Sequence, residues 1–444
     1  MPAAVAGHPA HRYPLSGSPA RGFAGGAAGF FVGFATVALY GPAAELFQDR
    51  MRLSGTALGF LVAAPQITGA LLRIPCGVWA DRVGGRVPML TLLGLSLIGM
   101  WGLAFVLAAA GSIGFNLYPV LVFFGLLCGS GIASFSVGLP QVSYWYPRNR
   151  QAAIIGAYGG IGNLAPGIFT LALPLAIGRW GLAGSYFAWF FFLIAGAGVY
   201  ALFARDAYYF QLRTAGLGSG ERRTIAAQRG QELFPVESAW NALIVAAENP
   251  RTWGLTLLYF VSFGGFLALS AWFPVFWVNS YRVGAVEAGI LSGAGFSLVA
   301  AVIRIYGGAL SDWIGAERTA FGAYCVVLAG ALLVTFGPGF SLSLAGELLM
   351  ALGMGTGNAA VFALVPKYVP RTVPSAAAFV GGIGATGGFI LPLFLGAVAD
   401  ALGRRGYAGG FFAFIVLAAI ALAVCWAFYR TGAGRFRTGD GARL

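Results

Sequence analysis

The chain has 444 residues, of which 59% are hydrophobic and only 9% are charged, and its mean hydropathy is +0.80. Roughly a quarter of the residues of a soluble globular protein are charged, so this composition excludes that class and predicts a polytopic membrane protein. The formal net charge of +13 does not require a nucleic-acid partner, because membrane proteins use cationic loops to fix their orientation.

Apolar runs of about 20 residues or more recur along the chain, and each could cross roughly 30 Å of hydrocarbon as a helix. The runs are 23–44, 57–80, 88–110, 117–140, 152–177, 182–204, 253–279, 286–310, 319–337, 341–366, 375–401 and 408–429. They predict an all-α membrane protein with twelve transmembrane helices in two pseudo-symmetric six-helix bundles.

The polar segments divide the chain into five regions. We expect a disordered cytoplasmic tail (1–22), an N-terminal six-helix bundle (23–204), a cytoplasmic connector (205–251), a C-terminal six-helix bundle (252–429) and a second cytoplasmic tail (430–444). Most of the 27 Lys and Arg residues lie in the tails, the connector and the loops on the same side of the membrane, rather than in the loops on the opposite side. This bias places both termini in the cytoplasm. No short apolar segment with a cleavage site precedes the first span, so we expect an integral protein of the cell membrane without a removed signal peptide.

The sequence motif R-x-x-x-G-x-x-x-D, which contains two charged residues, occurs twice in the apolar runs. An arginine, a glycine and an aspartate follow one another at steps of four residues in span two, and the same string returns in span eight. The two copies are Arg73, Gly77 and Asp81, and Arg304, Gly308 and Asp312. Their separation is the same at all three positions, so the chain looks like a duplicated half with two equivalent arginines.

The loop after span two joins glycines to charged residues in the pattern G-x-x-x-D-R-x-G-G-R, with a weaker copy after span eight. Its members are Gly77, Asp81, Arg82, Gly84, Gly85 and Arg86, and in the copy Gly308 and Asp312. The pattern resembles the loop signature of the major facilitator superfamily, which implies that family's fold. We expect this group to latch neighbouring helix ends by charge-assisted hydrogen bonds.

Spans five and eleven each carry a glycine-rich face, and each begins after a Pro-Arg pair. The glycines are Gly159, Gly160 and Gly162 in span five, and Gly381, Gly382, Gly384, Gly387 and Gly388 in span eleven. Small residues allow helices to approach closely in lipid. We expect these faces to slide against the arginine-bearing spans, so that leucine at Gly162 or Gly384 would block cycling more than binding.

Counting inward from the helix ends puts several side chains near the middle of the membrane. Arg73 and Arg304 lie roughly 12 Å from the cytoplasmic ends of their helices, which is too far for their side chains to reach the membrane surface easily. Four further side chains lie roughly 15 Å from these ends. They are Phe135, Asn163, Tyr259 and Phe263. Ordinary packing would explain the aromatic residues, and a helix-bridging amide would explain Asn163. The two arginines have no buried carboxylate to pair with, and we expect them to bind an anion.

The residues around these positions resemble the nitrate/nitrite porter family of the same superfamily. The resemblance rests on G-A-L-L-R at Arg73, G-x-G-N-L at Asn163, R-x-x-G-G at Arg304 and G-G-I-G-A-T-G-G-F in span eleven. It implies that the two arginines clamp the anion, that Phe135, Tyr259 and Phe263 wall the site, and that Asn163 contributes to it. Ala165 and Pro166 depart from the family's usual continuation. Planar guanidinium donors suit small planar anions such as nitrate and nitrite.

Other functions remain open at this point. The same fold could carry a short carboxylate, and nitrate could move with a proton rather than in exchange for nitrite. Proton symport would need a titratable group at the site. The only acid well inside a span is Glu347, which lies in the outer half of span ten, so we expect exchange. An enzyme or a receptor is disfavoured, because the spans contain no histidine or paired carboxylates and no signalling domain is attached. The four cysteines lie in apolar runs without metal-ligand spacing, and both histidines, His8 and His11, lie in the expected disordered tail. We therefore expect no cofactor or metal, and we expect a monomer. The cysteines are Cys76, Cys128, Cys325 and Cys425.

Overall fold

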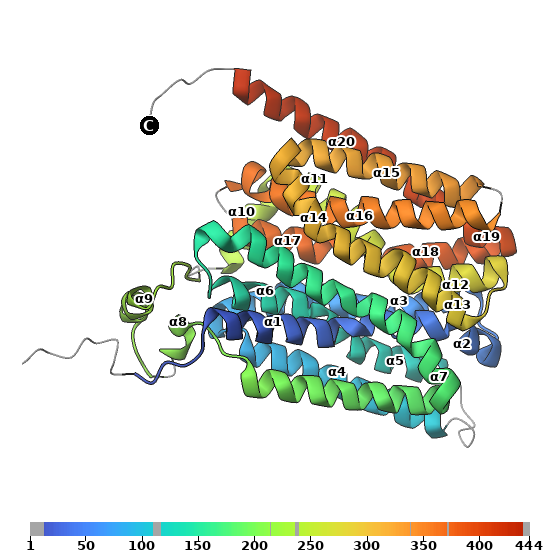
Figure 1. Ribbon diagram of the computed structural model, residues 1–444, viewed down its shortest axis with the longest axis horizontal. Helices are drawn as coiled ribbons and strands as arrows, with labels where there is room; N and C mark the ends of the chain where they lie inside the picture. Colours follow the sequence, from blue (N-terminus) through green and yellow to red (C-terminus); the bar gives the residue numbers. More distant parts are fainter. Residues whose placement is uncertain are drawn as a thin grey trace, which may run out of the picture.

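The computed structural model describes residues 13–109, 117–213, 215–235, 239–337, 339–370 and 373–437. The N-terminal half contains these segments: α1 (Pro19–Phe34), η2 (Ala35–Ala38), η3 (Gly41–Ala43), α2 (Ala44–Met51), α3 (Gly55–Val83), α4 (Arg86–Ala109), α5 (Tyr118–Cys128), η4 (Gly129–Ala133), α6 (Ser134–Ser143), η5 (Arg148–Arg150) and α7 (Gln151–Phe203). The helices of this half run side by side along one long axis (Figure 1).

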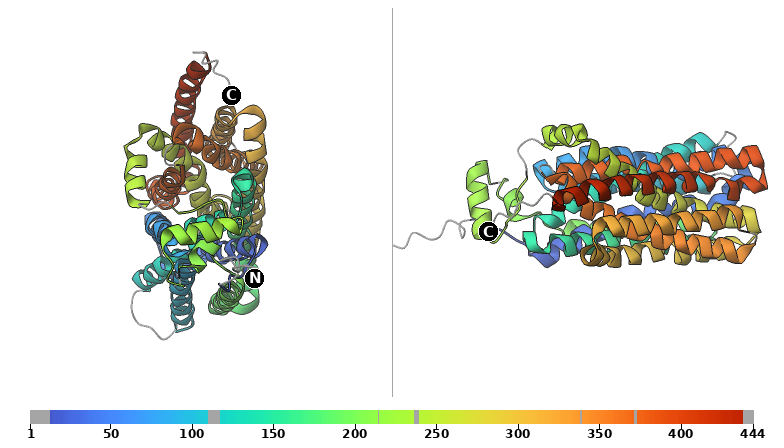
Figure 2. Two further views of the ribbon diagram at one scale, coloured as in Figure 1. Left: turned by 90° about the vertical axis from the view of Figure 1, so that its left-hand side faces the viewer. Right: turned by 90° about the horizontal axis from the view of Figure 1, so that it is seen from above.

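The connector and the C-terminal half continue the same arrangement. The connector contains α8 (Tyr208–Gln211), α9 (Ser219–Gln228) and α10 (Ala239–Glu248). The C-terminal half contains α11 (Pro250–Tyr259), η6 (Phe260–Gly264), α12 (Gly265–Tyr281), α13 (Ala285–Ile290), η7 (Leu291–Leu298), α14 (Val299–Ile314), α15 (Ala316–Phe336), α16 (Phe340–Tyr368), α17 (Val373–Gly384), α18 (Gly387–Leu402), α19 (Arg404–Gly409) and α20 (Phe412–Arg437). Seen end-on, the two halves lie on opposite sides of the bundle (Figure 2).

Eleven helices in the described part of the chain are long and apolar enough to cross a membrane. One of them, α7, is 53 residues long and contains the predicted spans five and six. The two meet at Gly181, whose backbone is not helical (φ 69°, ψ 174°), a conformation that glycine adopts without a side-chain clash. The predicted all-α transmembrane fold is therefore confirmed in the described residues, with a sharp turn where a loop was expected.

Two boundaries differ from the predicted ones. The first span begins at Pro19, inside the expected disordered tail, because the side chain of Ser18 caps the helix by accepting from the backbone N–H of Arg21. The last helix continues to Arg437, past the expected end of span twelve. Residues 1–12 and 438–444 of the predicted tails lie outside the described residues.

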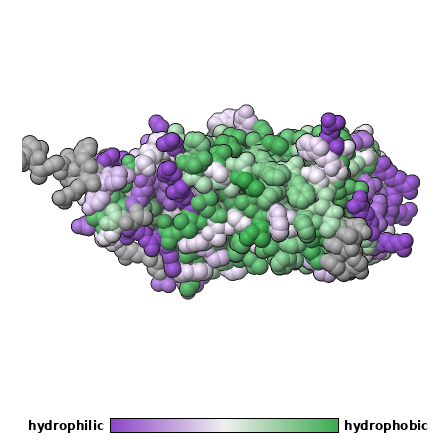
Figure 3. Space-filling view, turned by 90° about the horizontal axis from the view of Figure 1, so that it is seen from below, coloured by the Kyte–Doolittle hydropathy of each residue, from purple (hydrophilic) through white to green (hydrophobic). Residues whose placement is uncertain are grey.

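On the face of the bundle that Figure 3 shows, apolar residues form a broad belt, and hydrophilic residues gather at its two ends. Large side chains such as Ile98, Trp101 and Phe191 are more than half exposed within this belt. A soluble protein rarely exposes apolar surface on this scale, whereas a bilayer covers it. The chain is therefore an integral membrane protein. We call the end that carries α8 and α9 the connector end, and the opposite end the distal end.

The helices are irregular at middle depth. Span four passes through the 3-10 segment η4, span seven through the π-helical segment η6, and span eight through the π-helical segment η7. Span eleven is interrupted between α17 and α18, at Ala385 and Thr386. Such segments release backbone groups from regular helical bonding and often mark functional sites. In transporters, interrupted helices surround the substrate site near the bilayer midplane.

Candidate functional site

Arg73 lies in the middle of α3 and is buried, with 1% of its surface exposed. Its Nη1 donates a hydrogen bond of 3.2 Å to the carbonyl of Gly381 in the other half. This contact is possible because α17 passes close to α3: a Cβ at Gly382 would lie 2.7 Å from a side-chain carbon of Ile74. Nε and Nη2 of Arg73 are buried without a hydrogen-bond partner, so two charged donors remain free to bind a ligand.

Arg304 occupies the corresponding place in α14 of the other half and is 6% exposed. Its Nη1 is also buried without a partner. The guanidinium lies against the glycine face of span five, where a Cβ at Gly159 would be 3.4 Å from its central carbon. A side chain at Gly159 would therefore compete with Arg304 for space.

The rings of Phe135 and Phe263 lie next to both arginines. The guanidinium carbon of Arg73 is 5.2 Å from the Phe135 centroid and 4.8 Å from the Phe263 centroid. The corresponding distances for Arg304 are 5.8 and 5.6 Å. The shared ring of Phe263 keeps the two guanidinium carbons within roughly 10 Å of each other, a separation at which like charges repel. Cation–π contact offsets part of that repulsion.

Tyr259 and Phe263 lie one turn apart in span seven and stack, with 4.8 Å between ring centroids and an 11° angle between planes. Both are fully buried. The hydroxyl of Tyr259 is close to both guanidinium groups, yet its oxygen has no hydrogen-bond partner. It is therefore a further polar group that a ligand between the arginines could engage.

Asn163 is 1% exposed, and its Oδ1 has no hydrogen-bond partner. It follows Gly159 by one helical turn, so it lies on the face of α7 that meets Arg304. The neighbouring Tyr158 has a different role, because its hydroxyl donates to the carbonyls of Ser134 and Phe135 at 3.2 and 3.0 Å. Tyr158 thus holds the backbone that carries the Phe135 ring. Five of the six predicted site residues contact one another in one buried group: Arg73, Arg304, Phe135, Tyr259 and Phe263. Asn163 is buried on the neighbouring helix face.

The sequence analysis missed a fourth ring in this group, Phe362 of α16. Its centroid is 5.0 Å from Tyr259, 6.4 Å from Phe135 and 6.0 Å from the guanidinium carbon of Arg304. The signal was available in the duplication, because G-S-G-I-A-S-F ending at Phe135 matches G-T-G-N-A-A-V-F ending at Phe362 with one residue inserted. Phe362 is the counterpart of Phe135 in the second half.

Glu347, the acid predicted to lie inside span ten, is fully buried. It accepts a hydrogen bond of 2.7 Å from the indole of Trp277, while its Oε1 has no partner. It stands fifteen positions before Phe362 in the same helix, which is about 22 Å along the axis. Neither Arg73 nor Arg304 forms an ion pair with a carboxylate in the described part of the chain. The arginines thus have no anionic protein partner there.

The glycine faces meet different neighbours from those expected. Within the predicted set, Gly159, Gly160 and Gly382 approach the opposite half, whereas Gly162 lies against the ring of Phe30 in its own half. Gly384 lies against Tyr259, also in its own half. The expectation that Gly162 and Gly384 lie on a sliding face is therefore wrong, because both pack inside one rigid half. Gly160 and Gly382 are the positions that do face the other half.

Three others of the predicted glycines lie in the discontinuous span eleven. A Cβ at Gly387 would meet the backbone of Gly264 in span seven, and one at Gly388 would meet Leu267 in the same span. A Cβ at Gly381 would come no closer than 3.8 Å to Phe362. Gly387 and Gly388 thus let span eleven pack against span seven at the depth of the site.

The predicted loop cluster is formed in the N-terminal half. Asp81 accepts a hydrogen bond of 2.7 Å from the hydroxyl of Tyr144. Arg86 donates through its guanidinium to the carbonyl of Ala201 at 2.7 Å, and the exposed Arg82 accepts at its carbonyl from Arg213. These contacts join the connector ends of spans two, three, four and six. They do not reach the other half.

Asp206, a residue that the sequence analysis did not single out, completes this cluster. Its Oδ1 accepts from the backbone N–H of Arg86 at 3.0 Å, at the start of α4. Gly84 has a φ of 95° and leaves room for the carboxylate, because a Cβ there would lie 2.5 Å from Oδ2 of Asp206. Burial raises the pKa of Asp206 to about 6, although backbone N–H groups of Arg86 and Gly85 oppose that shift.

The copy of the cluster in the C-terminal half is different. Asp312 is exposed, and a Cβ at Gly308 would meet nothing within 4 Å. Gly315 retains the left-handed turn, with a φ of 93°. Gly77 in the first copy likewise has room, since its nearest neighbours are atoms of Ser136 at 3.5 Å or more. The duplication therefore preserves the turn but not the contacts around it.

Comparison with known proteins gives related transporters. The model of the Major Facilitator Superfamily matches residues 26–346. "Probable nitrate/nitrite transporter NarK2" of Mycobacterium tuberculosis is 31% identical over 368 residues, which cover 82% of this chain and 85% of that protein. "Nitrite extrusion protein" of Bacillus subtilis is 28% identical over 86% of this chain and 87% of its own length. "Probable nitrate/nitrite antiporter NarK1" of Thermus thermophilus is 28% identical over 82% and 81%.

Solved structures share the fold. A bacterial homolog of the human lysosomal transporter Spinster, in an inward-facing and unoccupied conformation, has a TM-score of 0.65 at 18% identity and covers 93% of this chain and 97% of its own. The xylose transporter XylE from E. coli, in a partially occluded inward open conformation, has a TM-score of 0.65 at 15% identity and covers 93% and 98%.

Proposed function

Because the chain belongs to the nitrate/nitrite porter family of the major facilitator superfamily, we propose that it carries nitrate and nitrite across the cytoplasmic membrane, in exchange for one another. One observation carries the proposal. Arg73 and Arg304 have buried N–H groups without partners beside the rings of Phe135 and Phe263, and no carboxylate pairs with them in the described part of the chain. A small planar monoanion supplies the missing acceptors and the missing charge.

The charges at the site favour exchange over one-way movement. Two guanidinium groups roughly 10 Å apart repel by roughly 1.7 kcal/mol at an effective dielectric constant of 20, whereas a monoanion midway between them gains roughly 6–7 kcal/mol. Since guanidinium groups stay protonated, the empty site keeps its repulsion at any physiological pH. An empty carrier should therefore close reluctantly and return slowly, whereas a loaded carrier should close readily.

The rocking of two halves around a central site supplies the route. Arg73 and Phe135 belong to the N-terminal half, and Arg304 and Phe263 belong to the C-terminal half. An anion between the arginines thus joins the two halves. The excess of Lys and Arg in the connector and tails supports a cytoplasmic connector end, and hence a distal end that faces outside.

Proteoliposomes test the exchange. Vesicles that contain nitrite, nitrate or neither anion are offered labelled nitrate outside, and uptake is expected only where an anion is present inside. Glu347→Gln should leave this exchange intact, because Glu347 is about 22 Å along its helix from the rings of the site. Uptake into anion-free vesicles that follows an inward proton gradient and disappears in Glu347→Gln would instead establish proton symport.

Competition on the purified protein tests the substrate. Unlabelled nitrate and nitrite should displace labelled nitrate, whereas formate and chloride should displace it far less well. Chloride lacks the planar acceptors that a guanidinium fork engages, and formate is planar but carries a C–H where nitrate has a third oxygen and nitrite has a nitrogen lone pair. Equal competition by formate would replace nitrate with a short carboxylate as the substrate.

A further inference from the structure

At the distal end, the two halves touch along spans two and eleven. A Cβ at Gly55 of α3 would lie 2.6 Å from the carbonyl oxygen of Gly396 in α18, and a Cβ at Gly59 would overlap the carbonyl of Pro392. Such backbone-to-backbone approach is possible only for glycine. The distal ends of α3 and α18 are therefore closed against each other in this structure.

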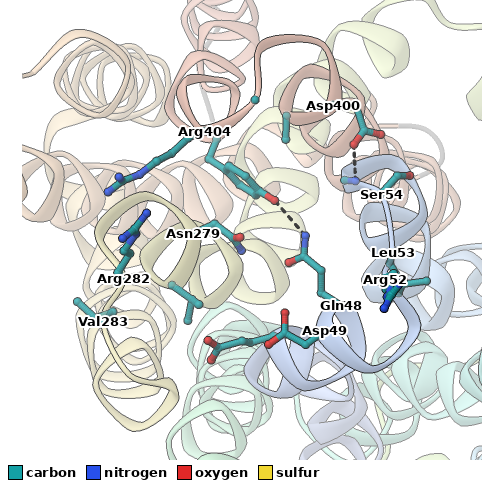
Figure 4. A pocket seen from close by; sticks show the side chains of 16 residues that line it. Gln48, Asp49, Arg52, Leu53, Ser54, Asn279, Arg282, Val283, Asp400 and Arg404 are labelled. Atoms are coloured by element: carbon teal, nitrogen blue, oxygen red, sulfur yellow. Dashed lines mark hydrogen bonds between the residues drawn. The ribbon is translucent and has the colours of Figure 1, made fainter.

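A carboxylate at this contact bonds across the two halves. Asp400, near the end of α18, accepts from the backbone N–H of Gly55 at 2.5 Å and from that of Thr56 at 2.7 Å. Its Oδ2 also accepts from the hydroxyl of Thr56 at 2.6 Å. Gly55 and Thr56 are the first residues of α3, whose N–H groups have no partner within the helix. Asp400 thus caps a helix of the opposite half (Figure 4).

The N-terminus of α3 is capped by side chains from both halves. Ser54, the N-cap residue of α3 itself, accepts from the N–H of Ala57, at 3.2 Å. The N–H groups of Gly55 and Thr56 are bonded to Asp400 from the C-terminal half. A carboxylate at a helix N-terminus also interacts favourably with the helix dipole. If the distal ends of α3 and α18 separate, these groups lose that partner together.

The pseudo-symmetric contact has no such cap. Spans five and eight also meet through glycine, because a Cβ at Gly293 would lie 2.8 Å from the carbonyl oxygen of Gly167. The residue that follows Gly159 by the same interval as Asp400 follows Gly381 is Gly178. A Cβ at Gly178 would meet nothing within 4 Å, and the N-terminus of α13 has no side-chain cap. The cap therefore belongs to one of the two contacts only.

The arginines around Asp400 do not explain the contact. Arg52, Arg282 and Arg404 line the same distal cavity as Asp400, together with the acids Glu45 and Asp49. Within the described residues, none of these arginines forms an ion pair with Asp400. Arg404 instead donates to the carbonyl of Ser280, at 2.6 and 3.2 Å. The carboxylate is held by the helix N-terminus and the hydroxyl of Thr56.

We propose that Asp400 is the distal latch: it holds the two halves closed at that end and releases α3 when the carrier opens there. The latch favours the distally closed state before any anion binds. An N-cap residue typically contributes about 1 kcal/mol, so its loss should raise the ratio of distally open to distally closed molecules about fivefold. The proposal concerns the movement of the halves and holds whichever anion is carried.

Spin-label distances measure this ratio directly. Cysteines at Arg50 and Arg405, two exposed distal positions in opposite halves, are labelled in a protein whose four native cysteines are replaced by serine. Distances are recorded by double electron–electron resonance in anion-free nanodiscs. Asp400→Asn and Asp400→Ala should each increase the longer-distance population, Ala by about fivefold and Asn by less, because an amide oxygen can keep one bond.

Asp49→Asn is the matched control, because Asp49 lines the same cavity and its side chain makes no hydrogen bond within the described part of the chain. It should leave the distance distribution unchanged. Unchanged distances in both Asp400 variants would overturn the latch, as would an equal shift in Asp49→Asn, which would indicate a general effect of cavity charge. Asp400 is exposed, so its variants should fold, and the distances do not depend on whether nitrate is the substrate.

Discussion

Replacement of Arg73 by lysine keeps the positive charge and removes the fork of donors. Nη1 of Arg73 donates to the carbonyl of Gly381, Nε and Nη2 have no partner, and the proposed function assigns these two donors to the anion. One ammonium on an unforked stem cannot keep the first bond and make the other two. Charge-assisted hydrogen bonds contribute about 1.5–3 kcal/mol each. We therefore expect a loss of about 3 kcal/mol or more, which is more than a hundredfold in Kd.

Titration of nitrate into the purified variants measures this loss, and exchange in proteoliposomes should fall with it. Arg86→Lys is the matched control, because Arg86 is the first residue of α4 and makes its hydrogen bonds at the connector end of the bundle, away from the site. Apparent melting temperatures should show that both variants are folded. Nitrate affinity of Arg73→Lys within tenfold of the wild type would refute the clamp, since charge alone would then suffice.

Three further outcomes follow from the structure. Phe362→Leu should weaken nitrate binding by about 1 kcal/mol, as expected for loss of an aromatic contact, and unchanged titration would remove this ring from the site. Gly160→Leu should slow exchange several-fold with little change in Kd for nitrate, because its Cβ would meet Ile305 of the other half at 2.7 Å. Gly382→Leu should slow exchange and also weaken nitrate binding, because it displaces the neighbouring carbonyl of Gly381, which accepts from Arg73. Burial raises the pKa of Asp206 to about 6, so its contribution to stability is present below about pH 4 and lost as the pH rises through 6. Over this pH range the wild type should lose up to about 3 kcal/mol of folding free energy through Asp206. Asp206→Asn should not lose it, so the apparent melting temperature of the variant should fall less than that of the wild type. A variant with the same pH profile as the wild type would contradict the assignment.

The sequence was most informative where a residue conflicts with its surroundings. An arginine in an apolar run is costly, so Arg73 and Arg304 stand out, and the duplication shows that they are equivalent. Counting along an ideal helix then predicted which rings lie at the same depth. This reasoning depends only on local geometry and on the symmetry of the repeat, and the fold that it predicted is confirmed.

The remaining features depend on contacts that a helix count does not specify. Phe362 is one of 37 phenylalanines, and one inserted residue obscures its match to Phe135. Gly162 and Gly384 follow the same glycine-rich pattern as Gly160, yet which glycine faces the other half depends on how each helix is rotated and interrupted. Asp206 follows span six directly, and its role is apparent only once α4 begins beside it.

The two halves differ in where the duplication has been kept. The central group is nearly symmetric, with an arginine and a phenylalanine at equivalent positions of each half, as the proposed clamp between the two halves requires. The contacts at the bundle ends are asymmetric: the loop cluster is formed around Asp81 but not around Asp312, and Asp400 has no counterpart at Gly178. A latch of about 1 kcal/mol shifts the resting population. It does not prevent turnover, because the anion gains roughly 6–7 kcal/mol between the two arginines. In the proposed cycle, the symmetric site sets which anion is bound, and the asymmetric contacts set which end opens at rest.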